Sequence, residues 1–435
     1  MTPDTRHVAA RGEVVGLVVN PVAGLGGSAG LKGSDGASVQ REALTRGAIP
    51  RAGERAAQAV RTLLSRRPGA RLVTVSGVMG EDSVRAAGGA PELVRLPLAP
   101  RAGGTKAADT RAAVVALAGV DLLLFAGGDG TARDVLDALR SLGDQAPPVL
   151  GIPAGVKVYS GCFALSPATA GFLAADHLSA LSRARTTAAE TTPSGVSLTG
   201  TLATNGGELD EAEVVDLDEE RYRYGLVSPR LYGTVRVPAA RGALSGRKVG
   251  ASATAAGTVG GIAREVVARM RPGVRYVLGP GATTSAVGRR LGLATTLLGV
   301  DVVEVEQSGG VLVAGDVSER ELFTLVNGHH AVVVLSVIGG QGFVVGRGNQ
   351  QISPRVMDAV TAGRTGGEQT AGPAGGGLMV LASQQKLAAL GGRPLLVDSG
   401  DEDLDRRLAG HVQVITGYRE STIYRICAAS EEFHG

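Results

Sequence analysis

The chain has 435 residues, of which 44% are hydrophobic, so it is long enough for two or three domains with sizeable buried cores. Its net charge is +3 and only 3% of its residues are aromatic. These values argue against a nucleic-acid partner, because the sequence holds neither a basic block nor a set of stacking side chains. The 66 glycines fit many tight turns between strands and helices.

The numbers and spacing of cysteine and histidine indicate the redox compartment of the protein and whether it holds a metal site. Cys162 and Cys427 are far apart, which fits a reducing compartment without a disulfide framework. Residues 1–12 lack the apolar stretch of a signal peptide, and no run of about 18 uncharged apolar residues occurs. We therefore expect a cytoplasmic protein with no membrane partner. The His329-His330 pair lacks the spacing of a zinc motif, so we expect no metal site.

Short apolar runs alternate with helical patterns through residues 13–165. Strands are predicted at 14–19, 71–76, 93–96, 121–125 and 149–152, and helices at 53–66, 107–118 and 131–142. This alternation predicts right-handed βαβ units, a parallel sheet, and a ligand at the carboxyl ends of its strands.

Residues 166–345 are predicted to form a β-rich second domain that binds the dinucleotide or substrate. It is expected to open with a helix at 166–182, followed by an insertion at residues 186–207 that is rich in Thr, Ser, Gly and Ala. Later strands are predicted at 213–217, 232–237, 275–278, 300–305, 331–337 and 342–345, with helices at 258–270 and 284–291.

Residues 346–435 are predicted to form a C-terminal α/β segment that packs back on the N-terminal domain. Its helices are expected at 354–361 and 384–390, and its strands at 378–382, 395–397 and 413–416. The glycine-rich residues 365–377 between them are expected to form a mobile loop.

One glycine-rich loop carries the most specific chemical signal. The apolar run 120–126 ends in Gly127-Gly128-Asp129-Gly130-Thr131, and a helical pattern follows. Glycines let the backbone approach a ligand closely, and a helix beginning near Thr131 turns free N–H groups towards an anion. Asp129 would repel a phosphate unless it polarises a substrate hydroxyl or binds a cation. The loop predicts a phosphate site with Asp129 as the catalytic group; the alternative is an ordinary turn in which Asp129 caps the helix.

In this setting the loop resembles the nucleotide loop shared by NAD kinases, diacylglycerol and sphingoid kinases and, more distantly, phosphofructokinases. Gly151-Ile-Pro-Ala-Gly-Val-Lys157 stands where that superfamily has its second glycine loop. Leu278-Gly-Pro-Gly-Ala-Thr-Thr284 looks like the dinucleotide loop of NAD kinases. The resemblance implies an NAD kinase-like fold and nucleotide contacts from Gly127, Gly128, Gly130, Thr131, Gly155, Lys157, Gly279, Gly281, Thr283 and Thr284.

Three other motifs resemble one branch of these proteins, the ATP-NAD kinase-like proteins related to the acetoin-catabolism X protein. They are Asn20-Pro21, Ile338-Gly-Gly-Gln-Gly342 and Gly346-Arg-Gly-Asn-Gln-Gln-Ile-Ser-Pro354. Asn20 and Asn349 thereby join the expected nucleotide contacts. The resemblance covers residues 14–425 and implies a homo-oligomer, a dimer or a tetramer.

The chain departs from the family pattern at the substrate end. Typical NAD kinases hold ribose and adenine with an Asn-Glu or Asn-Asp pair, which has no clear counterpart here, although Asn205 precedes Gly206. Lys157 stands where lipid kinases have Asn, and Ala282 stands where the branch has Thr. Losing that hydroxyl removes about 0.5 to 1.5 kcal/mol if it made a hydrogen bond.

Several motifs have a second interpretation. The loop 24–30 has the wrong glycine spacing for a dehydrogenase, and Lys32 lacks the neighbours of a Walker A lysine. Asn20 and the loop 24–30 contact ATP phosphates or form a flexible turn, and Lys157 neutralises phosphate or is solvated. Arg347 and Asn349 orient a nucleotide or a subunit contact, or their glycines only build a tight turn. The acidic run 216–220 is a solvated face rather than a metal site.

These features predict a kinase that transfers the γ-phosphoryl group of ATP, or of polyphosphate, to the 2′-hydroxyl of NAD. Asp129 would accept the proton of that hydroxyl, and Mg²⁺ would arrive with ATP. One alternative is another hydroxyl acceptor, a small metabolite or a lipid, although no basic amphipathic segment favours a lipid. Another is a nucleotide-binding regulator that has lost phosphoryl transfer.

Overall fold

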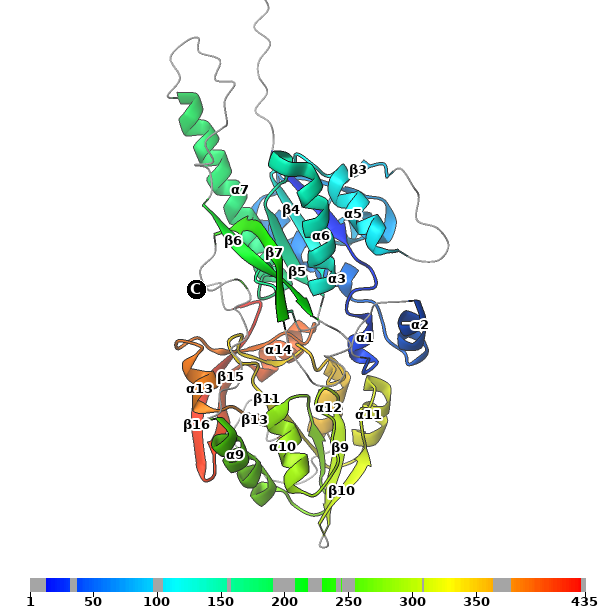
Figure 1. Cartoon of the computed structure of the whole chain (residues 1–435), viewed down its shortest axis with the longest axis vertical. Helices are drawn as coiled ribbons and strands as arrows, with labels where there is room; N and C mark the ends of the chain where they lie inside the picture. The colour runs from blue at the N-terminus through cyan, green and yellow to red at the C-terminus, as the bar shows by residue number, and fades with distance from the viewer. Residues whose placement is uncertain are drawn as a thin grey trace, which may run out of the picture.

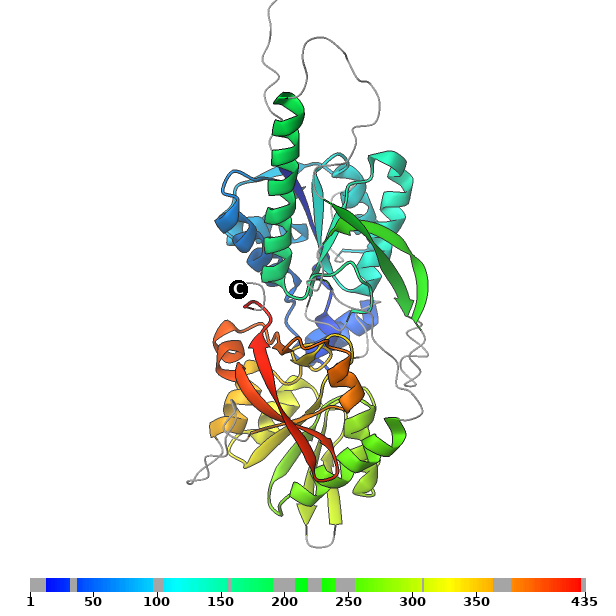
Figure 2. The same cartoon turned by 90° about the vertical axis from the view of Figure 1, so that its left-hand side faces the viewer.

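The structure is a computed structural model of the whole chain. It describes residues 13–31, 37–96, 105–154, 158–190, 208–217, 229–239, 244, 255–306, 309–362 and 377–431. The chain forms two α/β bodies that follow one another along the long axis of the molecule (Figures 1 and 2). None of the described helices is both long and apolar enough to cross a membrane.

The first body is built on a parallel sheet of five strands. These are β1 (Val14–Val19), β2 (Arg71–Val75), β3 (Pro91–Val94), β4 (Leu122–Gly127) and β5 (Val149–Pro153). Their order is β3-β2-β1-β4-β5, and every neighbouring pair is parallel. All residues of β4 and β5 are buried, as expected for central parallel strands that are covered on both faces. The predicted parallel sheet is thus confirmed.

Seven α-helices belong to this part of the chain among the described residues; the first two share a small core of their own, and the other five pack against the sheet. The seven are α1 (Leu25–Ser28), α2 (Ala37–Thr45), α3 (Ala52–Arg66), α4 (Glu81–Ala86), α5 (Ala107–Ala116), α6 (Asp129–Leu142) and α7 (Pro167–Glu190), with short 3₁₀ turns η1 (Gly77–Met79) and η2 (Gly143–Gln145). Alternate residues of β4 face opposite sides of the sheet. Leu122 and Leu124 pack with α3 and α7, whereas Leu123 and Phe125 pack with α5 and α6.

The boundary predicted at residue 165 differs from the structure. Helix α7 packs along α3, with Leu173 and Leu178 in the core of the first body. The antiparallel hairpin of β6 (Leu209–Leu217) and β7 (Pro229–Pro238) packs on α6, where Val214 shares a cluster with Leu136. Both elements follow the sheet in sequence but cover its helices. Residues 191–207 of the predicted insertion lie outside the described residues.

The second body is built on a nine-stranded sheet, which agrees with the predicted β-rich character. Its strands are β8 (Arg275–Leu278), β9 (Asp301–Glu306), β10 (Gly309–Ala314), β11 (Ala331–Ser336), β12 (Phe343–Val345), β13 (Leu378–Leu381), β14 (Leu395–Val397), β15 (Gly410–Gly417) and β16 (Glu420–Ala428). They follow the order β10-β9-β8-β11-β13-β15-β16-β14-β12. Strands β8, β11, β13 and β15 are parallel neighbours, and so are β16, β14 and β12. Strand β9 pairs antiparallel with both β8 and β10, and β15 pairs antiparallel with β16.

Helices cover both faces of the second sheet. They are α9 (Ala255–Arg269), α10 (Ala282–Arg290), α11 (Glu319–Val326), α12 (Pro354–Ala362), α13 (Gln384–Ala388) and α14 (Glu402–Leu408). Val332 and Val334 of β11 pack with α9 and α10, whereas Val333 and Leu335 pack with the core that contains α11, α12 and α14.

The C-terminal segment has two relationships with the rest of the chain. Its strands β13 to β16 complete the second sheet, so residues 346–435 are not a separate layer. The segment that follows β14 reaches the first body, where Asp398 pairs with Arg55 and Glu402 accepts a hydrogen bond from Gln58. Arg347 also donates to Leu165 O, and Leu396 and Ala429 share an apolar cluster with Leu165, so the expected packing against the N-terminal domain is confirmed. Residues 365–376 of the predicted mobile loop lie outside the described residues.

Candidate active site

The Gly-Gly-Asp-Gly-Thr loop joins β4 to α6. Gly127 ends the strand, Gly128 is the N-cap, and Asp129 is the first helical residue, two residues earlier than predicted. Gly128 offers no side-chain cap, so the first-turn amides of α6 keep the positive end of the helix available to an anion. Gly130 and Thr131 lie in that first turn. The local geometry is that of an anion site at the carboxyl edge of a parallel sheet.

The tight contact between the ends of β1 and β4 explains two of the predicted residues. A Cβ atom at Gly127 would overlap the side chain of Thr131, so only glycine fits there. The Thr131 hydroxyl is buried and accepts a hydrogen bond from Asn20 Nδ2 at 3.0 Å. The backbone N–H of Asn20 also donates to Ala126 O at 3.0 Å. Asn20 and Thr131 thus lie together and fix the loop on which Asp129 is mounted.

The Asp129 carboxylate is held by the segment that follows β5. It accepts a hydrogen bond from Tyr159 N at 2.9 Å and one from Ser160 N at 2.8 Å. Burial raises the pKa of Asp129, and the hydrogen bonds from Ser160 and Tyr159 and the charge of Arg133 oppose part of this rise. Since Gly128 is the N-cap and these bonds lead to another segment, Asp129 is more than a helix cap. A carboxylate with a raised pKa is suited to accept a proton.

The second glycine loop follows β5, and its centre, with Gly155 and Lys157, lies outside the described residues. Its first part is fixed to the Asp129 loop, because Ala154 N donates to Gly127 O at 3.0 Å. At Gly151 a Cβ atom would overlap the ring of Phe163, which makes this glycine a packing requirement.

The third predicted loop links β8 to α10 in the second body. Gly281 is the N-cap of α10 with φ of 135°, a conformation that favours glycine, and Thr284 Oγ1 donates to Gly281 O at 2.9 Å. At Gly279 a Cβ atom would overlap Leu335. The side chain of Thr283, in the first turn of α10, is buried. This turn therefore repeats the strand–glycine–helix arrangement of the Asp129 loop, and the Thr284 hydroxyl stabilises the turn itself.

Asn349 behaves differently from its predicted role. Its Oδ1 accepts from Gly346 N at 2.8 Å and its Nδ2 donates to Val344 O at 2.8 Å, in a buried position. Both ends of the amide are thus used within the turn that follows β12. These two hydrogen bonds fit the tight-turn alternative, and a nucleotide contact of Asn349 stays a prediction.

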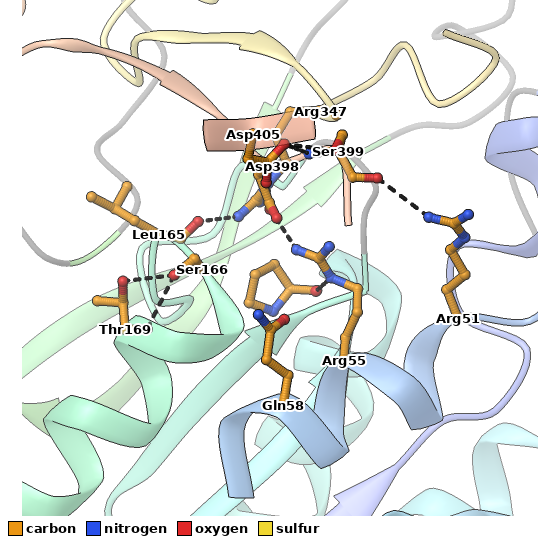
Figure 3. A network of polar contacts seen from close by, with 12 residues as sticks. Arg51, Arg55, Gln58, Leu165, Ser166, Thr169, Arg347, Asp398, Ser399 and Asp405 are labelled. Carbon is orange, nitrogen blue, oxygen red and sulfur yellow. Dashed lines mark hydrogen bonds and ion pairs between the residues drawn. The ribbon is translucent and has the colours of Figure 1, made fainter. Parts of the chain in front are cut away.

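A network of polar residues joins the two bodies, and of its three central members the sequence had indicated only Arg347 (Figure 3). Asp398, just after β14, pairs with Arg55 of α3 and, at 3.2 Å, with Arg347 Nε. Arg55 Nε also donates to Pro153 O, and Arg347 Nη2 donates to Leu165 O. The carboxyl ends of strands from both sheets therefore meet at this network. Arg55 was detectable as a charge within the apolar face of α3, next to Ala52, Ala56 and Ala59.

Burial shapes the charges of this network. Arg347 is 2% exposed, and burial lowers its pKa to about 10, against the opposing effect of Asp398. Arg347 therefore stays protonated near neutral pH. Asp405 of α14 accepts from Ser399 N at 3.0 Å, and burial raises the pKa of this carboxyl to about 6. A pocket of about 450 Å³ opens beside the network between α3 and α14, lined by side chains of both charges such as Arg51, Asp401 and Arg406.

Comparison with protein families resolves which group of kinases the chain matches. The ATP-NAD kinase N-terminal domain matches residues 15–180, and the ATP-NAD kinase C-terminal domain matches residues 271–426. The chain belongs to the ATP-NAD kinase family. It is accordingly a kinase, and the two family domains coincide with the two sheets, leaving the β6–β7 hairpin and α9 between them. Searches among curated proteins and among solved structures each found no match.

Proposed function

We propose that this member of the ATP-NAD kinase family phosphorylates the 2′-hydroxyl of the adenosine ribose in NAD, with ATP as donor. The observation that carries the proposal is the Asp129 carboxylate at the uncapped start of α6, fixed by two backbone amides. A kinase of this class needs an anion site next to a group that accepts a hydroxyl proton, and this loop supplies both.

The predicted residues of the Asp129 loop and of the Gly279–Thr284 turn have roles in this proposal. The first-turn amides of α6 hold phosphate oxygens, while Asn20 and Thr131 keep the loop in place. Asp129 takes the proton of the 2′-hydroxyl while the hydroxyl oxygen forms a bond to the γ-phosphorus. The bond between the γ-phosphorus and the bridging oxygen breaks, and ADP leaves with that oxygen. Mg²⁺ that arrives with ATP neutralises phosphate charge near Asp129. The Gly279–Thr284 turn supports the dinucleotide from the second body.

The arrangement of strand ends where the two bodies meet supports a nucleotide site to which both bodies contribute. The loops after β1, β4 and β5 and the segments after β12 and β14 all follow the carboxyl ends of strands, where ligands bind in open α/β sheets. The acetoin-catabolism X branch, the cytoplasmic location and the homo-oligomeric state stay predictions of the resemblance and the composition.

The direct test incubates the purified protein with ATP, Mg²⁺ and NAD and measures NADP by chromatography. Formation of NADP supports the proposal, and replacing ATP with polyphosphate in a parallel arm identifies the donor. If ATP is consumed only when another hydroxyl compound is present, a metabolite or a lipid, then that compound and not NAD is the acceptor. Tight binding of ATP or NAD without any turnover would instead identify a regulator.

A further inference from the structure

A single peptide group connects the second body to the catalytic carboxylate. The carbonyl oxygen of Val158 accepts a hydrogen bond from Gln341 Nε2 at 3.0 Å, in a buried position. The N–H of the same peptide group, that of Tyr159, donates to Asp129 Oδ2 at 2.9 Å. Gln341 belongs to the second body and Asp129 to the first. The peptide between Val158 and Tyr159 thus lies between them as a bridge.

Gln341 is presented by a rigid turn. Residues 338–342 link β11 to β12, and Gly340 and Gly342 adopt φ of 80° and 81°, which glycine accepts without strain. Gly342 N donates to Ile338 O at 2.9 Å, which closes the turn. Gln341 itself is 3% exposed. The closed turn and the burial of the side chain therefore hold the Gln341 amide in place where it contacts Val158. We expect this contact to fix the position of the Val158–Tyr159 peptide group.

Hydrogen bonds on both sides of a peptide group reinforce each other, because donation to its oxygen polarises its N–H. The Gln341 contact thereby strengthens the bond from Tyr159 N to Asp129 and fixes the direction of the carboxylate. We propose that Gln341 is a positioning residue of the phosphotransfer site, which aligns Asp129 when the two bodies are in contact. This inference rests on the proposed role of Asp129 in proton acceptance.

The primary test replaces Gln341 with Leu, which keeps the size and removes the donor. We expect kcat to fall about three- to tenfold, in line with one weakened hydrogen bond, while KM for ATP and NAD changes less than about twofold. A weaker amide bond favours the neutral carboxyl, so the acid limb of the kcat profile should move to higher pH. Besides the amides of Tyr159 and Ser160, the charge of Arg133 and the thiol of Cys162 surround Asp129 and are unchanged.

The matched control is Gln58→Leu, because Gln58 Nε2 also makes a hydrogen bond between the bodies, at 3.1 Å to Glu402. This variant should leave kcat and the acid limb unchanged. If both variants lower kcat equally without moving the limb, Gln341 only holds the bodies together and the proposal is wrong. If the Gln341→Leu variant does not fold, Gln341→Asn replaces it in this test, because it keeps the amide on a shorter side chain. It should move the acid limb of the kcat profile in the same direction but by less.

Two further measurements separate this inference from the proposed function. In the Asp129→Asn background, Gln341→Leu should cause no additional loss of turnover, because its effect passes through Asp129. The Asp129 carboxyl can also be titrated by carbon-13 NMR without any substrate. A wild type that makes no NADP contradicts the proposed function, whereas an Asp129 titration that is identical in wild type and Gln341→Leu contradicts the positioning role.

Discussion

At the scale of single residues, Asp129 is subject to opposing influences. Removal from water disfavours its charged form, while two backbone amides and the charge of Arg133 favour it, and burial has the larger effect. The result is a carboxyl that holds its proton more tightly than an ordinary aspartate. Such a group is a better proton acceptor near neutral pH than an exposed carboxylate would be.

This balance predicts a pH dependence. In the proposed mechanism phosphoryl transfer needs the deprotonated form of Asp129, so kcat/KM should fall as the pH is lowered, with a midpoint above the ordinary pKa of an aspartate. Steady-state rates between about pH 4 and pH 9 measure it, with circular dichroism to verify that the protein stays folded. A rate that stays level down to the ordinary aspartate range would show that burial does not control this group.

The sequence predicted Asp129 because all the relevant signals lie within five consecutive residues. It also indicated Asn20, which the structure places against Thr131. It could not reveal the bridge to Gln341, because that hydrogen bond joins residues 183 positions apart. The sequence also did not reveal that the Asn349 amide stabilises its own turn, and its contact with a nucleotide stays a prediction.

At the scale of elements, success did not depend on length. The strands Val14–Val19, Arg275–Leu278 and Leu395–Val397 have the predicted bounds, whereas the nine-residue strand Glu420–Ala428 was missed. Helix α14 was also missed, although Asp401 caps it and Leu404 and Leu408 share its buried side. Helix α11 was also missed, and its capping box of Ser318 and Glu321 was a readable signal.

Helix α14 carries a titratable side chain, Asp405, whose protonation should be visible in stability. Asp405 has a pKa of about 6 in the folded state and the lower, ordinary value when unfolded. Its protonated form therefore stabilises the fold at low pH, and this contribution, on the order of 3 kcal/mol, is lost between about pH 4 and pH 6. Asp405→Asn keeps an acceptor for Ser399 and does not titrate.

We expect the free energy of unfolding of Asp405→Asn, relative to wild type, to rise with pH across that interval. Urea unfolding at several pH values measures the difference. A difference that is constant with pH would mean that the Asp405 pKa is not raised by burial.

At the scale of the whole molecule, two sheets face one another through the loops at their carboxyl ends. The sequence predicted a helix at 166–182 and strands at 213–217 and 232–237, but it did not reveal that these elements pack on the first body. The ion pairs between the bodies were equally hidden, since Arg55 and Asp398 are 343 positions apart. Contacts of this kind depend on the tertiary arrangement rather than on local pattern.

The network between the bodies should contribute strongly to stability. Asp398→Asn leaves the guanidinium groups of Arg55 and Arg347 buried without their counter-charge, so the free energy of unfolding should fall by about 3 to 5 kcal/mol. Denaturant unfolding at neutral pH measures this. Arg407→Gln is the control, because its pair with Asp358 is exposed and should contribute less than about 1 kcal/mol. Equal effects of the two substitutions would contradict a special role for the buried network.

The most direct measurement of the central claim compares wild type with Asp129→Asn in NADP formation from ATP and NAD, with ATP affinity determined by calorimetry. The substitution preserves size and removes the proton acceptor. We predict that turnover falls about a hundredfold or more while ATP affinity and the fold are retained. Turnover near the wild-type rate in Asp129→Asn would show that this carboxylate does not carry the reaction.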